Sequence, residues 1–384
     1  MGEAAQVTPT ELSPTPFPTG SRGDVWDVQP AKAEAQTLSP PELEMDTIEA
    51  LEWMKPRAVP KPKDGSWPVL FNMVLAVGAF AGPESSSNVD AFFYNRAREA
   101  LSVRLLQRGS LHLVQAFSLM ANYLQKRNKP NSGFTFLGIA FNMAMGLGLH
   151  REFPDQSMSA SAMEIRRRVW WTLFIFDSGA RLTFGRPSIS LAGVNVRAPE
   201  NLNDDDLTVD IEVLRASRAQ PTITSSLIWQ RKLAEISNVA NAKLLEERLP
   251  KKSLMLALDD QIVAWKEAPP SYFDEALGAE LSWFAVPRMI LLWRSQHLRI
   301  VLTRPFLLDV LQRHQELDLS HPDEAVGRCI SAAEDCVKSI IGFCASQNGY
   351  TGALVWYATY WPVTAVFVSV TRLIYAPHHP SAPV

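Results

Sequence analysis

Apolar side chains recur at helical spacing along most of this chain. The stretch 110–130 places Leu113, Phe117 and Met120 on one face of a helix, because residues three and four apart share a face. Comparable runs predict helices over 88–109, 133–152, 162–184, 222–247, 253–266, 278–313, 322–346 and 351–375. The alternating runs that are typical of strands are nearly absent. The pattern therefore predicts an all-α fold, a single large multi-helix bundle domain over residues 68–375.

Both ends of the chain lack this pattern. Residues 1–60 are rich in Pro, Thr, Ser and Glu and include "SPTPFPTG" and "LSPPELE". Such segments bury too little apolar surface to offset the entropy of ordering the chain. We expect a disordered, Pro-rich N-terminal tail and linker over 1–60, and a second short tail over 376–384.

The segment between 342 and 371 carries no charged side chain and is long enough to cross a bilayer. It also contains Thr359, Thr364 and a central Pro362. Buried helices of large all-α domains have the same composition. We therefore predict a core helix here and no contact with a membrane.

Composition gives little sign of nucleic-acid binding. The chain has 47% hydrophobic and 20% charged residues, and its net charge is −3. A dedicated DNA-binding domain usually shows a clear basic excess. Any contact with DNA must therefore come from a local patch or from a module outside this sequence.

Three cysteines, Cys329, Cys336 and Cys344, fall on or near one face of a predicted helix. A structural zinc site needs four ligands and usually begins with a close pair such as C-x₂-C. No such pair occurs. The three side chains are predicted to be buried thiols in a reducing compartment.

The segment 166–188, "RRRVWWTLFIFDSGARLTFGRPS", allows three interpretations. Aromatic rings behind a basic patch could stack on nucleic acid, or the segment could lie at a membrane edge or form a core helix. On a helix, "VWWTLFIF" leaves almost no polar face, which is typical of a helix buried on most sides. Asp177 and Arg181 have the i, i+4 spacing of an ion pair. The core helix is the favoured interpretation.

The ends of this helix also have sequence signals. Ser161 and Glu164 have the spacing of a capping box, which predicts that the arginines at 166–168 lie near the helix start and are partly solvated. The tripeptide Gly-Arg-Pro at 185–187 predicts the helix end, because glycine permits the reversal and proline forbids continuation.

These motifs together resemble a known family. "LGLHR" is followed by "RRRVWW", then by an aspartate and by "GRP", and "LTRPFLL" follows further along the chain. This order is similar to that of the fungal-specific transcription factor domain, the middle homology region of binuclear zinc-cluster regulators. The residues that carry the resemblance are Leu147, Gly148, Leu149, His150, Arg151, Arg166, Arg167, Arg168, Trp170, Trp171, Asp177, Arg181, Gly185, Arg186, Pro187, Arg304, Pro305 and Phe306.

The resemblance implies a regulatory role in the nucleus, in transcription of RNA polymerase II genes. It implies a helical effector domain that responds to a small-molecule effector, or that forms a homo- or heterodimer with a zinc-cluster regulator. The family's zinc cluster needs six cysteines and these 384 residues contain three. Zinc is thus expected only if an upstream six-cysteine module exists. DNA would be reached indirectly or through that N-terminal module.

An enzyme is the alternative. The run Asp204–Asp206 lies in "NDDDLTVD", and aspartate-rich motifs hold Mg²⁺ in all-α isoprenoid synthases. The flanking residues favour a loop over a helix, and no second acidic motif accompanies it. We predict a solvated acidic loop, no catalytic or metal-binding residues, and a protein that is not an enzyme.

Overall fold

The computed structural model describes residues 65–82, 88–153, 158–207, 217–268, 270, 273, 282–313, 323–346 and 352–375. The described residues all belong to the second of the chain's two units, 61–384. The predicted tails, 1–60 and 376–384, lie outside the described residues. Across the described parts of the second unit the regular structure is helical, with no strand, and this confirms the all-α prediction.

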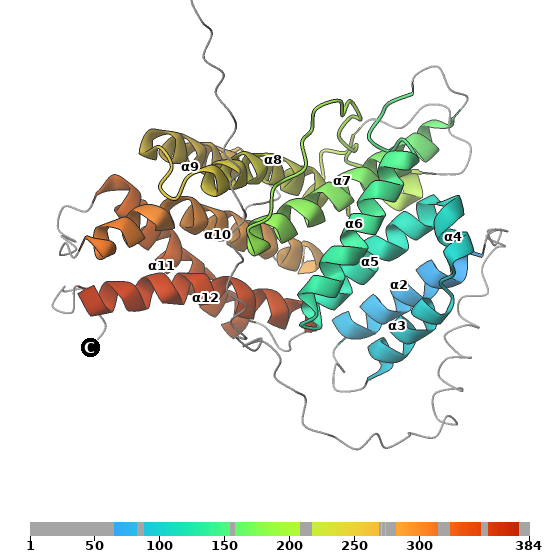
Figure 1. Ribbon diagram of the computed structural model, residues 1–384, viewed down its shortest axis with the longest axis horizontal. Coiled ribbons are helices and arrows are strands. Elements are labelled where there is room, and N and C mark those ends of the chain that lie inside the picture. The colour runs from blue at the N-terminus through green and yellow to red at the C-terminus, as the bar shows by residue number, and fades with distance from the viewer. Residues whose placement is uncertain are drawn as a thin grey trace, which may run out of the picture. The chain divides into compact units, whose positions relative to one another are not determined.

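Eleven α-helices and one 3₁₀ turn account for the regular structure of the described residues (Figure 1). The helices are α2 (Trp67–Ala81), α3 (Val89–Glu99), α4 (Val103–Arg108), α5 (Leu111–Lys126), α6 (Pro130–Gly146), α7 (Ala160–Phe184), α8 (Ser225–Glu246), α9 (Lys252–Glu267), α10 (Ser282–Gln312), α11 (Glu324–Ala345) and α12 (Gly352–Tyr375).

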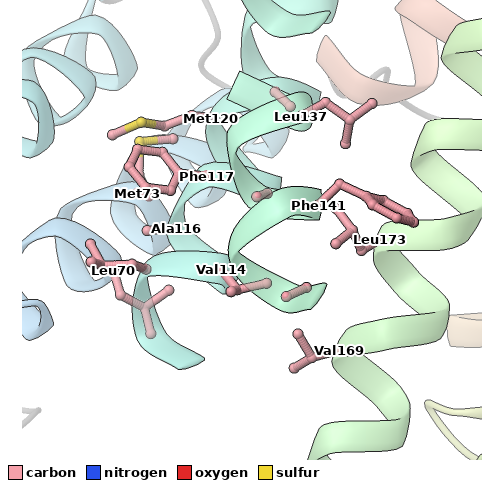
Figure 2. Packing of buried hydrophobic residues seen from close by; sticks show 14 of the residues in the cluster. Leu70, Met73, Val114, Ala116, Phe117, Met120, Leu137, Phe141, Val169 and Leu173 are labelled. Atoms are coloured by element: carbon pink, nitrogen blue, oxygen red, sulfur yellow. The ribbon is translucent and has the colours of Figure 1, made fainter. Parts of the chain in front are cut away.

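Two hydrophobic cores lie within this helical unit. The first is formed mainly by α2 to α7, and Figure 2 shows Met73, Phe117, Phe141 and Leu173 converging in it from four helices. The second is formed mainly by α8 to α12, around Trp293. The helices α7 and α8 pack against each other and join the two cores.

Two predicted helices differ in their bounds. The helix predicted over 88–109 is two helices, because the Ser102 hydroxyl accepts a hydrogen bond from the Leu105 backbone N–H at 3.4 Å and starts a new helix there. The helix predicted over 133–152 ends at Gly146, since Gly148 has a φ of +69°. A Cβ atom at Gly148 would also lie 3.1 Å from the Phe153 ring, so the position favours glycine twice over.

The N-terminal cap of α7 was predicted wrongly. Ser159 is the cap, and its hydroxyl accepts a hydrogen bond from the Ala162 backbone N–H at 3.2 Å. Ser161 and Glu164 lie inside the helix, and both are buried. The glutamate is therefore available for a different role, which is described below.

The prediction that the cysteines are buried thiols is confirmed for two of the three, which lie on α11. Cys329 and Cys336 are free and buried on the inner face of α11, while Cys344 is half-buried. Burial raises the pKa of Cys329 to about 11 and that of Cys336 to about 12. Both side chains are therefore protonated thiols that pack as small apolar groups.

The prediction of a buried C-terminal helix is confirmed for one face of α12. Trp361, Ala365 and Val368 pack into the second core. The opposite face is apolar and uncovered, and the stretch Leu354–Ile374, 28% buried, is the one described segment long and apolar enough to cross a membrane. Its exposed apolar residues are Val355, Val363, Val366, Phe367, Val370, Leu373 and Ile374.

Candidate functional site

Two arginines of the motif bind a buried carboxylate in the first turns of α7. Glu164 is completely buried and accepts hydrogen bonds from Arg168 Nε at 3.0 Å and from Arg167 Nη1 at 3.5 Å. The backbone N–H of Glu200, in the segment after the helix, donates to the same carboxylate at 3.1 Å. Glu164 is therefore the centre of an ion-pair network, a role that its capping-box spacing did not indicate.

The two arginines extend this network to segments distant in sequence. Arg167 donates to both carboxylate oxygens of Glu152, at 2.6 and 3.2 Å. Arg168 donates to the Leu202 carbonyl at 2.8 Å and to Asp204 Oδ1 at 2.9 Å. Arg167 thus holds the segment that precedes α7, and Arg168 holds the long segment that follows it, against the start of the helix.

The third arginine of the triplet contacts the preceding motif. Arg166 Nη2 donates to the carbonyl of Leu147 at 2.9 Å. All three guanidinium groups therefore bind groups of their own chain. The prediction that they are partly solvated is wrong for Arg167, which is 4% exposed. Because bidentate arginine–carboxylate pairs have strict geometry, the network fixes the register of α7 against its neighbours.

Burial and charge oppose each other within the network. Burial raises the pKa of Glu164 above its ordinary value, although Arg168 and Arg167 act to lower it. Burial also acts to raise the pKa of Glu152, but the hydrogen bonds from Arg167 and from the Arg197 backbone outweigh it, so that pKa is lowered. Glu152 therefore contributes stability above the pKa of an unfolded glutamate, and that contribution is lost as the pH falls through the lower folded value.

The two tryptophans that follow the arginine triplet are buried, as predicted. Trp170 is 1% exposed and packs against Phe141 and His150, with ring centroids 5.2 and 5.8 Å away. Trp171 is 4% exposed and donates through Nε1 to the Arg197 carbonyl at 2.8 Å. Neither ring has a free face on which a base could stack.

His150 belongs to the same cluster. Its backbone carbonyl accepts from the N–H groups of Asn195 and Val196, at 3.1 and 3.2 Å. Burial, together with the charge of Arg151, lowers the pKa of the ring. The histidine therefore joins the end of α6 to the segment after α7.

The predicted end of α7 is also confirmed. Arg181 Nε donates to Asp177 at 2.7 Å, and its Nη1 donates to the Pro187 carbonyl at 2.7 Å. Gly185 has a φ of +58°, and the Arg186 backbone N–H donates to the Arg181 carbonyl at 2.9 Å, which closes the helix.

The last motif lies in a different part of the fold. Arg304, Pro305 and Phe306 are on α10, and Phe306 is buried in the second core. The structure therefore assigns this motif to the packing of α10 and not to the ion-pair network around α7.

The acidic run does not form an open loop. Asp204–Asp206 is one turn of 3₁₀ helix, and Asp206 is 1% exposed. Its carboxylate accepts from Arg218 Nε at 2.8 Å and Nη2 at 2.6 Å, so the prediction of a solvated loop is wrong for this residue. Throughout the described ranges, no three or more His, Cys, Asp or Glu side chains are grouped to hold a metal ion. The alternative of a magnesium enzyme gains no support.

A cavity between the two cores was not anticipated from the sequence. It is bounded by α5, α7, α8, α10 and α12, and the empty space within it and its mouth amounts to about 770 Å³. Its lining includes the cations Lys126 and Arg294 but neither aspartate nor glutamate. The signal in the sequence is one arginine directly after the apolar run "MILLW".

The fold and the motif network define an all-α domain of the kind found in fungal transcription regulators. The chain belongs to the fungal specific transcription factor domain family, which it matches over residues 59–267. No solved structure is significantly similar to it.

Several curated relatives are transcription regulators by name. The chain is 26% identical to the lactose regulatory protein LAC9 of Kluyveromyces lactis, over 79% of this chain and 33% of that protein. It is 28% identical to the thiamine repressible genes regulatory protein thi1 of Schizosaccharomyces pombe, over 43% of this chain and 22% of that protein. It is 24% identical to the activator of stress genes 1 of Saccharomyces cerevisiae, over 71% of this chain and 28% of that protein. The matched region thus spans a third or less of each relative.

Proposed function

We propose that this chain is the regulatory helical domain of a zinc-cluster-type transcription regulator that acts on RNA polymerase II genes in the nucleus. Family membership and the names of the relatives support this role. The observation that carries it is that the motif side chains make their contacts inside the domain. Its arginines and tryptophans bind groups of the same chain, so the domain would act through its conformation and its partners.

DNA and zinc enter this proposal only through another module. With three cysteines, these residues cannot supply the six that a binuclear cluster requires. DNA would be reached through an N-terminal module or indirectly through a DNA-binding partner. The chain itself would act without a catalytic site or a cofactor.

The uncovered face of α12 is the surface best suited to a partner. Val363, Phe367 and Ile374 lie on this face and are 66, 54 and 67% exposed. Contiguous apolar surface of this kind marks interaction sites in soluble proteins. We propose that a second copy of this chain covers it, which would give a homodimer.

A double variant tests this interface. Because two carboxylates cannot be buried against an apolar partner, V363E/F367E should shift the chain from dimer to monomer by light scattering after size exclusion. V239E is the matched control, since Val239 is equally apolar and 50% exposed on α8. A monomeric wild-type chain at tens of micromolar, or its recovery with membranes after cell fractionation, would contradict the proposal.

The regulatory role is tested by tethering. The chain is fused to an unrelated DNA-binding module and expressed in a fungal host beside a reporter that carries that module's site. We expect nuclear accumulation and a reporter output that differs from that of the module alone. A fusion of the same module to an unrelated helical protein of similar size shows whether the size of the fused domain alone changes the output.

A further inference from the structure

The cavity between the two cores contains a cation without a counter-ion. Arg294 projects from α10, is only partly accessible, and donates to Gln230 Oε1 at 3.0 Å and to the Ile175 carbonyl at 3.2 Å. Within the described part of the chain no carboxylate lies in ion-pairing range of its guanidinium. Burial lowers the pKa of Arg294 to about 10, so the side chain is still charged at neutral pH.

Such a charge is costly unless something compensates it. Arg299, five positions further along the same helix, shows the usual solution, since its Nε donates to the buried carboxylate of Asp259 at 2.7 Å. Arg167 has two carboxylate partners in the same way. The environment of Arg294 is therefore that of a binding site and not that of a structural ion pair.

Other polar groups face the same space. No described residue forms a hydrogen bond with the Ser237 hydroxyl, although Ser237 is 3% exposed and lines the cavity. His297 also lines it, and burial together with the charges of Arg304 and Arg294 lowers its pKa to about 4. The ring is thus neutral at physiological pH. A positive potential and an unused hydroxyl together favour an anion with oxygen acceptors.

One wall of the cavity is aromatic. Trp356 and Tyr360 of α12 are stacked, with ring centroids 5.0 Å apart and an interplanar angle of 7°. Tyr357 and Trp361 form a second stacked pair, with centroids 4.8 Å apart. All four residues line the cavity. Such a wall suits a planar apolar body, whereas a fully hydrated inorganic anion would gain nothing from it.

We propose that this cavity binds a small organic carboxylate with a flat apolar body, its carboxylate meeting Arg294 and Ser237 and its body lying on the aromatic wall. The inference rests on the proposed regulatory function and names its effector class. Because the lining comes from helices of both cores, an occupant would couple one core to the other.

The test uses the purified full chain and five probes. Benzoate and phenylacetate carry both features, benzamide keeps the ring without the charge, and acetate keeps the charge without the ring. Inorganic phosphate reports a general anion site. We expect saturable binding of the two aromatic carboxylates by calorimetry or ligand-observed NMR, and at least about tenfold weaker binding of benzamide, acetate and phosphate.

The decisive variant is R294M, which removes the charge and keeps an apolar stem. Because the charge is uncompensated, R294M should be at least as thermally stable as the wild type, and it should bind benzoate at least about tenfold more weakly. R299M is the matched control. It loses the pair with Asp259, so its melting temperature should fall while benzoate binding is retained below the transition.

If R294M does not fold, S237A still tests the proposal, because it removes only the hydroxyl that faces the cavity. It should weaken benzoate binding severalfold at unchanged stability. Equal binding of benzoate and benzamide, preferential binding of phosphate, no binding of either aromatic carboxylate, or full binding by a folded R294M would overturn the proposal. If the tethered chain still alters the reporter, only the effector class fails and the regulatory function stands.

Discussion

Replacing Glu164 with alanine is expected to lower the free energy of unfolding by about 3 kcal/mol. The carboxylate is fully buried and accepts hydrogen bonds from Arg167, Arg168 and the Glu200 backbone. Its removal would leave three donors without this acceptor, in a site from which water is largely excluded. Urea unfolding followed by circular dichroism measures the change.

The control is an ion pair of the same type on the surface. Lys243 and Glu246 lie three residues apart on α8 and are 42 and 55% exposed. E246A should change the free energy of unfolding by no more than about 0.5 kcal/mol. Equal effects of E164A and E246A would show that Glu164 does not organise the start of α7.

The second large effect is expected at Trp170. Replacement by alanine should cost about 3–5 kcal/mol, because it leaves a cavity between α6 and α7 where the ring packs against Phe141. W170F is the matched variant. Since no described residue accepts a hydrogen bond from the indole Nε1, only volume is lost and the cost should be about 1 kcal/mol. Thermal and urea unfolding measure both.

W170A and W170F also test the interpretation that the aromatic rings of this motif stack on nucleic acid. If Trp170 stacked on nucleic acid, W170A would leave stability unchanged and would reduce binding to a single-stranded oligonucleotide. The buried position predicts the reverse, a large loss of stability with no specific effect on binding.

Helical spacing predicted most of the fold because local pattern and tertiary burial agree in these helices. The break at Ser102 was missed, since apolar spacing continues across it and only a side-chain cap interrupts the helix. Glu164 was misassigned for a related reason. The spacing of Ser161 and Glu164 fits a capping box, while the groups that bury the glutamate come from residues around 200.

The candidate site was predictable only where its residues are adjacent in sequence. The spacing of Asp177 and Arg181 on one helix predicted their ion pair. The cavity could not be predicted in this way, because five helices bring its lining together. Arg294 gave a weak signal as a charge next to an apolar run, but whether a carboxylate pairs with it depends on helices distant in sequence.

The tethered reporter tests the central claim most directly, that the folded helical domain regulates transcription. The wild-type fusion and W170F are expected to change reporter output severalfold relative to the DNA-binding module alone. W170A, expressed to the same level, should lose that effect as its fold is lost. An output equal to that of the module alone for the folded wild-type fusion, or an unchanged effect of an unfolded W170A, would contradict the account.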